Sequence, residues 1–265
     1  MSAATDPSYI PGCVDTHAHL TVAEARGVAI DLIVAQAVDA RVAGIIDVGI
    51  EPSDLQARRD RLGRWPIVFL TSGLHPTSVA PDSWREAIDT LCAQVDGLVA
   101  VGEIGLDYHW STDHADLQRR VLREQFAIAR DAGLPVIIHN RDSEADMLDI
   151  LADELPYGVM HCFSQDADYC RRCVGLGMHV SFGGNVTYRS AGSIRDAVAV
   201  VPDELLLVET DSPFLSPQPV RGKPNHPGFL RHTIACVAEV RGTTAERIAE
   251  LTASNARRLF GLNSR

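Results

Sequence analysis

The sequence predicts a single (β/α)8 barrel, because short apolar segments recur eight times and stretches with helical spacing or helix-forming composition separate them. The segments are rich in β-branched residues and hydrophobic throughout, which is typical of parallel strands covered on both faces. A length of 265 residues suits one large barrel or two small domains, and no low-complexity linker or shift in composition marks a boundary. We therefore expect one domain over residues 1–265, with residues 1–11 as a flexible N-terminal extension.

The eight predicted strands are spaced so that a crossover fits after each of them. In chain order they cover residues 12–15, 44–49, 67–71, 98–102, 135–139, 158–161, 179–182 and 205–209.

Four of the stretches between or after these segments have a helical character. Residues 22–42 are mostly aliphatic, and residues 83–95 and 113–132 carry apolar side chains at helical intervals. Residues 244–260 begin with Thr-Ala-Glu-Arg and end before a glycine, which is typical of a final helix with a glycine stop. Residues 212–227 hold five prolines after the last predicted strand, so we expect a loop over the barrel mouth.

The composition limits the classes of function. The formal net charge is -11 and the pI is near 5.3, which argues against a broad basic surface, so a nucleic acid would be held at a local site. No apolar run reaches the roughly 18 residues of a membrane span, and the N-terminus lacks a basic start followed by an apolar stretch. We expect a soluble, cytoplasmic protein that does not bind a membrane, and no obligate protein partner is evident.

Six cysteines in a chain of this length do not form the dense pattern of a secreted disulfide scaffold, and we expect them to be reduced. Cys170 and Cys173 form one C-x-x-C, which is compatible with a redox pair or half of a zinc knuckle. A four-ligand zinc site would need further partners, and no second C-x-x-C exists. The surrounding sequence is typical of a helix, so we favour packing of the two thiols.

Six residues of metal-ligand type stand at the ends of five predicted strands, where barrels of this class carry their reactive groups. They are His17, His19, Glu103, His139, His161 and Asp211. Each alone has an ordinary explanation, such as a hydrogen-bonded structural histidine or a helix-capping glutamate. Together at one barrel mouth, unpaired carboxylates would repel one another and unpaired imidazoles would be poorly solvated, whereas divalent ions remove both problems.

Four histidines and two carboxylates exceed the ligands of one tetrahedral site and suit two ions bridged by a carboxylate. A bound ion lowers the pKa of a water molecule, and an adjacent carboxylate can take its proton. The residues alone therefore indicate a binuclear hydrolase.

Seven pieces of the chain, in order from Val14 to Phe260, resemble the TatD family of metal-dependent deoxyribonucleases within the amidohydrolase-like barrels. The pieces are Asp15-Thr-His-Ala-His-Leu, Gly73-Leu-His-Pro, Gly102-Glu-Ile-Gly-Leu-Asp-Tyr, Pro135-Val-Ile-Ile-His-Asn-Arg, His161-Cys-Phe-Ser, Glu209-Thr-Asp-Ser-Pro-Phe-Leu and Asn255-Ala-Arg-Arg-Leu-Phe. The ordered set is far more specific than any one piece.

The resemblance implies a role for each ligand. His17, His19 and Asp211 match the ligands of one metal, His139 and His161 match those of the other, and Glu103 matches the bridge. Asp211 would also be the general base, so that Asp211 and Glu103 are the expected catalytic residues. The metals would be Mg, Mn or Zn, and the sequence does not choose among them.

Three further residues are expected at the substrate. His75 matches a family position where an imidazole contacts phosphate, although His-Pro can equally serve to end the third strand. Arg141 follows His139 by two residues in an extended turn, so its guanidinium can grip phosphate in a bidentate manner, unless it is a solvated surface arginine. Glu209 matches an additional acidic residue near the metals, and a structural role that holds a neighbouring ligand is an alternative.

The rim of the expected pocket departs from the family. Thr77-Ser78 stands where many relatives carry a histidine or an acidic residue, and Pro224-Asn-His-Pro lacks the charged neighbours of a familiar loop. Arg189, Arg221 and Lys223 are further candidates for cations near phosphate. Tyr108 and Trp110 could stack on a base, but packing within their loop is favoured.

The leading hypothesis is a divalent-metal-dependent phosphodiester hydrolase that acts on DNA, exonucleolytically by resemblance to the family. A second hypothesis is hydrolysis of a small ester, lactone or amide, because the same metal and base can attack a carbonyl carbon. A third is a non-catalytic barrel that binds metal or a protein partner, which retention of all six ligand residues disfavours.

Overall fold

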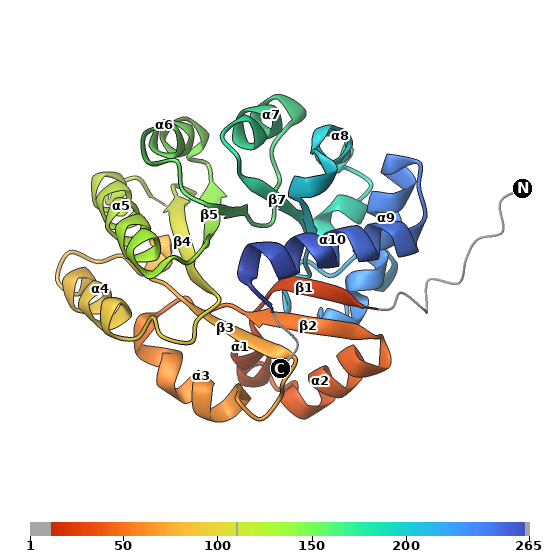
Figure 1. Ribbon diagram of the computed structural model, residues 1–265, viewed down its shortest axis with the longest axis horizontal. Coiled ribbons are helices and arrows are strands. Elements are labelled where there is room, and N and C mark those ends of the chain that lie inside the picture. Colours follow the sequence, from red (N-terminus) through yellow and green to blue (C-terminus); the bar gives the residue numbers. More distant parts are fainter. Residues whose placement is uncertain (1–11, 110, 263–265) are drawn as a thin grey trace, which may run out of the picture.

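The computed structural model describes residues 12–109 and 111–262, and the expected N-terminal extension and Trp110 lie outside these ranges. Eight parallel strands form one sheet in the order of the chain (Figure 1). They are β1 (Cys13–Ala18), β2 (Val42–Asp47), β3 (Val68–Ser72), β4 (Ala100–Asp107), β5 (Val136–Arg141), β6 (Gly158–Met160), β7 (His179–Phe182) and β8 (Leu206–Val208). All eight predicted strands and the predicted (β/α)8 barrel are confirmed.

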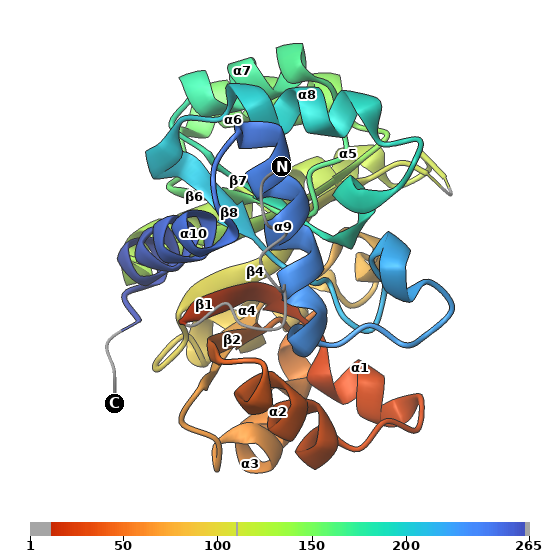
Figure 2. The same ribbon diagram turned by 90° about the vertical axis from the view of Figure 1, so that its right-hand side faces the viewer.

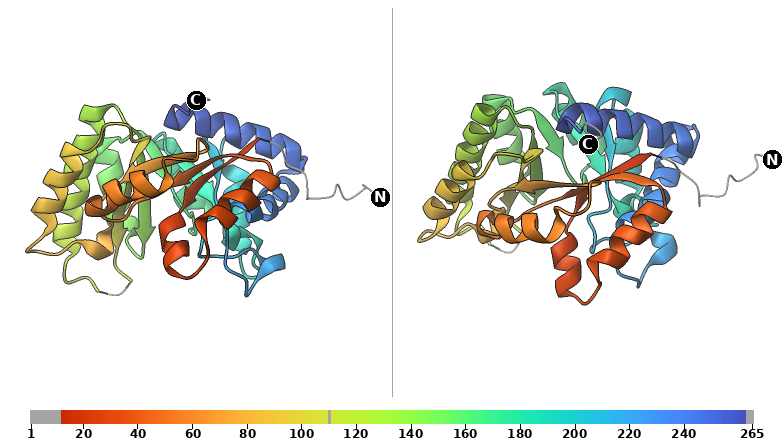
Figure 3. Two further views of the ribbon diagram at one scale, coloured as in Figure 1. Left: turned by 90° about the horizontal axis from the view of Figure 1, so that it is seen from below. Right: turned by 60° about the horizontal axis from the view of Figure 1, so that its bottom comes forward.

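The helices surround the strands, as Figures 1 and 3 show from several directions. The α-helices are α1 (Leu20–Ala25), α2 (Ile30–Asp39), α3 (Leu55–Leu62), α4 (Trp84–Ala93), α5 (Ala115–Ala132), α6 (Glu144–Glu154), α7 (Ala167–Gly175), α8 (Gly192–Val200), α9 (Leu230–Arg241) and α10 (Ala245–Phe260). None of the described helices is long and apolar enough to cross a membrane.

The strands form as the continuous hydrophobic pattern requires, because helices cover one face and barrel-filling side chains the other. Every residue of β1 and of β4 is buried. The amphipathic helices follow their capping signals: the hydroxyl of Thr244 accepts a hydrogen bond from the backbone N–H of Arg247 at the start of α10, and Gly261 ends it at φ 61°. Helix α10 packs against both β1 and β8 and covers the place where the barrel closes (Figure 2).

The structure differs from the sequence prediction in two elements. Residues 22–42 do not form one helical stretch, because Gly27 takes φ 89° and separates α1 from α2. Strand β4 continues to Asp107 instead of ending at residue 102, with a shift in its pairing to β5 between Val101 and Ile104. Both differences change what lies at the barrel mouth.

The two smaller sequence expectations agree with the structure. Cys170 and Cys173 are buried on α7 as free thiols, so the pair packs as favoured. The proline-rich segment 212–227 contains one short 3-10 helix, Gln218–Val220, and a second one, Pro227–Phe229, begins at its last residue. Phe214 and Leu215 of this segment line the cavity at the barrel mouth.

Candidate metal centre

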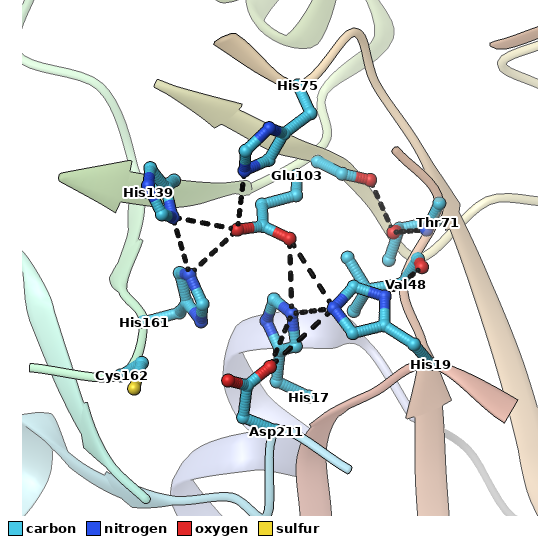
Figure 4. Close-up of polar contacts among 12 residues, drawn as sticks. His17, His19, Val48, Thr71, His75, Glu103, His139, His161, Cys162 and Asp211 are labelled. Carbon is cyan, nitrogen blue, oxygen red and sulfur yellow. Dashed lines mark hydrogen bonds and ion pairs between the residues drawn. The ribbon is translucent and has the colours of Figure 1, made fainter. Parts of the chain in front are cut away.

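The six expected ligands converge at the carboxyl ends of the strands (Figure 4). Strands β1, β4 and β5 contain His17, Glu103 and His139. His19 and His161 directly follow β1 and β6, and Asp211 stands three residues after the end of β8. Glu103 lies at the centre of the cluster. Its Oε1 is 3.0 Å from Nδ1 of His139 and 2.9 Å from Nε2 of His161, and its Oε2 is 3.4 Å from Nε2 of His17.

The two oxygens of Glu103 thus face different sets of imidazoles. His19 completes the set on the Oε2 side, with its Nε2 3.6 Å from Oε2 of Glu103 and 3.6 Å from Oδ1 of Asp211. The backbone of Asp211 is in the left-handed region at φ 55°, which is unfavourable for an aspartate and often marks a functional position.

Hydrogen bonds orient the imidazole rings of the ligands. Nδ1 of His19 lies 2.9 Å from the carbonyl oxygen of Val48, which can only accept, so this nitrogen donates and, in the neutral ring, the lone pair is on Nε2. His139 lies between two carboxylates, with Nε2 3.1 Å from Oδ2 of Asp107 and Nδ1 3.0 Å from Oε1 of Glu103. The contacts with Val48 and Asp107 orient the two rings and turn the other nitrogen of each ring toward Glu103, where a bound ion would use it as a ligand.

His161 repeats this arrangement with a buried glutamate. Its Nδ1 lies 3.2 Å from Oε1 of Glu209, and the same oxygen accepts a 2.8 Å hydrogen bond from the backbone N–H of Cys162. Glu209 has no exposed surface. These contacts favour a structural role, in which Glu209 holds His161 in position, over a direct contact of Glu209 with the substrate.

His75 has the opposite hydrogen-bonding pattern. The backbone N–H of Thr77 donates to its Nδ1 over 3.2 Å, and the Thr77 hydroxyl lies 2.7 Å from the same nitrogen. An amide N–H can only donate, so a neutral His75 carries its proton on Nε2, which faces Oε1 of Glu103 at 3.3 Å. His75, Glu103 and His139 are close enough together to hold an ion, but this pattern favours His75 as a donor toward the pocket.

The charge balance of the site keeps the carboxylates ionised. Burial opposes the charge of Glu103, yet the field of His161 and hydrogen bonds from the neighbouring imidazoles hold its pKa well below the ordinary value. Burial also opposes the charge of Asp211, and a hydrogen bond from His19 with the surrounding imidazoles lowers its pKa. Anionic oxygens and imidazole nitrogens thus face one another at the floor of a cavity, with the oxygens of Glu103 almost completely buried.

One of the imidazoles is held in the neutral form that a metal needs. The ring of His17 stacks on that of His161, with centroids 4.0 Å apart and planes inclined by 15°. Burial, followed by the charge of His161, lowers the pKa of His17. Three groups of side chains, including His17 with His19 and Asp211 and His17 with Glu103 and His161, have their donor atoms within 4.8 Å of one another. This donor set fits divalent metal ions.

Two acidic residues that support the ligands were not singled out from the sequence. Asp107 orients His139, and the motif that contains it was recognised only for Glu103. Asp15 accepts hydrogen bonds from the backbone N–H groups of His17 and Thr210, at 3.3 and 2.9 Å, and so joins the two ligand-bearing segments. Complete burial raises the pKa of Asp15 to about 7.

A buried ion pair fixes the ends of β2 and β3 beside the site. Arg58 of α3 donates to Oδ2 of Asp47 from Nε over 2.8 Å and from Nη2 over 2.6 Å, and to the carbonyl oxygen of Thr71 over 2.8 Å. The other oxygen of Asp47 accepts from the backbone N–H of Leu20, next to His19, over 2.8 Å. Gly49 is required here, because a Cβ would collide with the Arg58 guanidinium.

A cavity of about 600 Å³ opens above the ligands. His75 and Arg141 line it, as expected of substrate contacts, whereas Glu209 does not. The guanidinium of Arg221 lies 4.3 Å from the ring centroid of Tyr188, and neither Arg221 nor the other two candidate cations is part of the lining.

The tyrosine that was considered for base stacking is held elsewhere. The hydroxyl of Tyr108 donates to Asp146 over 2.8 Å, and Arg119 donates to that hydroxyl over 3.2 Å. Its ring packs against the hydrophobic core, in agreement with the favoured loop-packing role.

Comparison with known proteins supports a family assignment. Residues 14–261 match the family model described as TatD related DNase. The chain is 37% identical over 254 residues to the uncharacterized metal-dependent hydrolase YabD of Bacillus subtilis, covering 94% of this chain and 99% of the relative. It is 33% identical over 242 residues to a Citrobacter koseri protein named 3'-5' ssDNA/RNA exonuclease TatD, and the match covers 88% of this chain and 93% of that relative.

Solved structures agree. The crystal structure of YjjV, a TatD homologue from Escherichia coli K12, superposes with a TM-score of 0.85 at 29% identity, covering 96% of this chain and 100% of that one. The (β/α)8 barrel, the His and carboxylate groups at its mouth and the match over nearly the whole chain lead to one assignment. The chain belongs to the TatD family of metal-dependent hydrolases.

Proposed function

We propose that this enzyme hydrolyses phosphodiester bonds at the 3' end of single-stranded DNA, using two divalent metal ions. The observation that carries the proposal is the central position of Glu103, whose two oxygens face two separate sets of imidazoles. A carboxylate in this position suits a bridge between two ions. The polarity and the single-stranded substrate are supported by relatives that are named 3'-5' ssDNA/RNA exonuclease.

We assign the ligands to the two ions as the family resemblance implies. His17, His19 and Asp211 would hold one, and His139 and His161 the other, with Glu103 shared. Ions bound there would stabilise negative charge on the phosphoryl oxygens and make a nearby water more acidic. Mg, Mn and Zn all remain candidates for the native ions.

The side chains of the chain itself bind the phosphate and move protons. Asp211 is ionised at neutral pH, with Oδ1 turned to His17 and His19, so its carboxylate can accept a proton from the attacking water. His75 presents its Nε2–H to the pocket and can donate to a phosphate oxygen. Arg141 stands in the cavity wall, where a guanidinium can bind a second phosphate oxygen.

The surface charge of the protein favours recognition of a strand end over recognition of a long duplex. A chain with a net charge of -11 repels the phosphates of a duplex laid along its surface. A cavity of about 600 Å³ at the end of a barrel instead accommodates the last nucleotide of a single strand. The binding energy would come from the few contacts around the scissile phosphate.

Hydrolysis of end-labelled single-stranded DNA by metal-free protein, with Mg, Mn or Zn added back, tests the proposal. Stepwise shortening from the 3' end is expected with at least one metal, and Asp211→Asn should abolish it. Asp168→Asn, which removes an exposed carboxylate on α7, is the matched control and should keep full activity. Failure to cleave with any metal would refute the DNase proposal and favour an ester, lactone or amide substrate.

A further inference from the structure

Phe214 exposes an aromatic ring in the wall of the cavity beside the metal centre. The residue is 37% exposed and stands three residues after Asp211. Among the large hydrophobic side chains exposed in the described residues, it is the only one that lines this cavity. An exposed apolar ring at this position leaves hydrophobic surface for a ligand to cover.

Two side chains contact the ring of Phe214, and part of the residue stays exposed beside them. Its centroid lies 6.1 Å from that of His19, and the two planes are inclined by 77°, so His19 contacts it in an edge-to-face manner. The guanidinium carbon of Arg26, at the end of α1, lies 4.4 Å from the ring centroid. Over a third of the surface of Phe214 remains exposed despite these contacts, and a base can cover that surface.

The backbone holds the ring at a fixed position relative to the catalytic residues. The N–H of Phe214 donates to the carbonyl oxygen of Asp211 over 2.9 Å. The buried side chain of Asn225 donates to the carbonyl oxygens of Phe214 and Thr210, over 2.7 and 2.8 Å. Asn225, whose segment departs from the family, thus ties the ring to the turn that carries Asp211.

We propose that Phe214 is a stacking platform for the nucleobase next to the scissile phosphate. The inference rests on the proposed nuclease function and adds the part of the substrate that the metal centre does not contact. A planar aromatic ring attached to a phosphodiester suits this wall, because a base can stack on the phenyl ring while its phosphate lies at the metal ligands. The cation of Arg26 adds attraction for the negatively charged strand near the same ring.

The test compares Phe214→Leu, which keeps the apolar volume without the aromatic face, with Phe214→Tyr, which keeps the ring. The substrates are single strands that end in an ordinary nucleotide or in an abasic one. Phe214→Leu should raise KM about 5- to 150-fold on the ordinary strand, the equivalent of one stacked base, and should leave the abasic strand unaffected. Phe214→Tyr should behave as the wild type on both strands.

Tyr157→Leu is the matched control, because it removes an exposed aromatic ring that does not line the cavity. Tyr157→Leu should leave the KM for the ordinary strand and the KM for the abasic strand unchanged. Equal effects of Phe214→Leu on the ordinary and the abasic strand would overturn the stacking proposal while leaving the nuclease proposal intact.

A binding measurement separates the two proposals if the wild type cleaves neither strand, which would refute the nuclease function. A short single strand with phosphorothioate linkages and 2-aminopurine at its 3' end is titrated with metal-loaded protein. Quenching by the wild type that is lost in Phe214→Leu would support the base contact without hydrolysis. Equal quenching in both proteins, or none, would overturn the stacking proposal.

Discussion

Replacing Glu209 with glutamine would show whether this residue orients a metal ligand or contacts the substrate. Glu209 has no exposed surface, and its Oε1 accepts from Nδ1 of His161 and from the N–H of Cys162. Glu209→Gln keeps the size of the side chain and one carbonyl oxygen but removes the negative charge. The imidazole of His161 then loses its charge-assisted hydrogen bond and becomes a weaker ligand.

The expected loss is a factor of about 10–100 in metal affinity, which is typical for the partner of a ligating histidine and corresponds to about 1.4–2.7 kcal/mol. A hydrogen bond to a charged group contributes about 1.5–3 kcal/mol to stability, which agrees with the free energy that corresponds to this loss of metal affinity. At saturating metal the variant should bind substrate with nearly the wild-type KM, because Glu209 does not line the cavity.

Competition between apo protein and a metal-chelating dye measures the affinity, and circular dichroism verifies that the fold is retained. Glu204→Gln is the matched control, since it removes an exposed carboxylate next to the opposite end of β8. Wild-type metal affinity together with a raised KM for DNA would refute the reasoning and return Glu209 to the substrate-binding role expected from the sequence.

Two further predictions concern stability. Arg58→Leu leaves the buried carboxylate of Asp47 without its partner and should lower the free energy of unfolding by about 3–5 kcal/mol in urea. Arg64→Leu, which breaks an exposed ion pair, should cost less than about 1 kcal/mol, and similar losses in the two variants would contradict the argument. Burial lowers the pKa of His179 from an ordinary 6.5 to about 4, so its contribution is present above pH 6.5 and lost as the pH falls toward 4. Unfolding at pH 7.5 and 4.5 should show about 2–3 kcal/mol less acid destabilisation in His179→Leu than in the wild type, while exposed His114→Leu should show the wild-type loss.

The strands and the ligand positions could be predicted from the sequence because one pattern determines both. Continuous hydrophobic segments specify parallel strands, and in a barrel their carboxyl ends share one mouth. Residues as distant as His17 and Asp211 could therefore be placed together without any contact information. Arg141, which lines the cavity, was placed there by its spacing of two residues from His139, whereas His75 was identified by its match to a family position.

Asp107 could not be found in this way, because the predicted fourth strand ended at residue 102. In the structure Gly105 takes φ 151° inside the strand, and a Cβ there would collide with the carbonyl oxygen of His139. The glycine permits the close approach of β4 and β5 that brings Asp107 to His139. Similarly, the pairing of His161 with Glu209, 48 residues later, depends on the register of separate strands and has no local signal.

The barrel closes between its first and last strands at the metal ligands themselves. The N–H of Asp211 donates to the carbonyl oxygen of His17 over 2.9 Å, and the N–H of His19 donates to that of Ser212 over 2.7 Å. During synthesis, residues 17–19 can form these hydrogen bonds only after residues 211–212 have been made, when nearly the whole chain has been synthesised. If His17, His19 and Asp211 bind one ion as proposed, a growing chain cannot complete this set of ligands, and metal binding at full affinity would report that the last strand has docked.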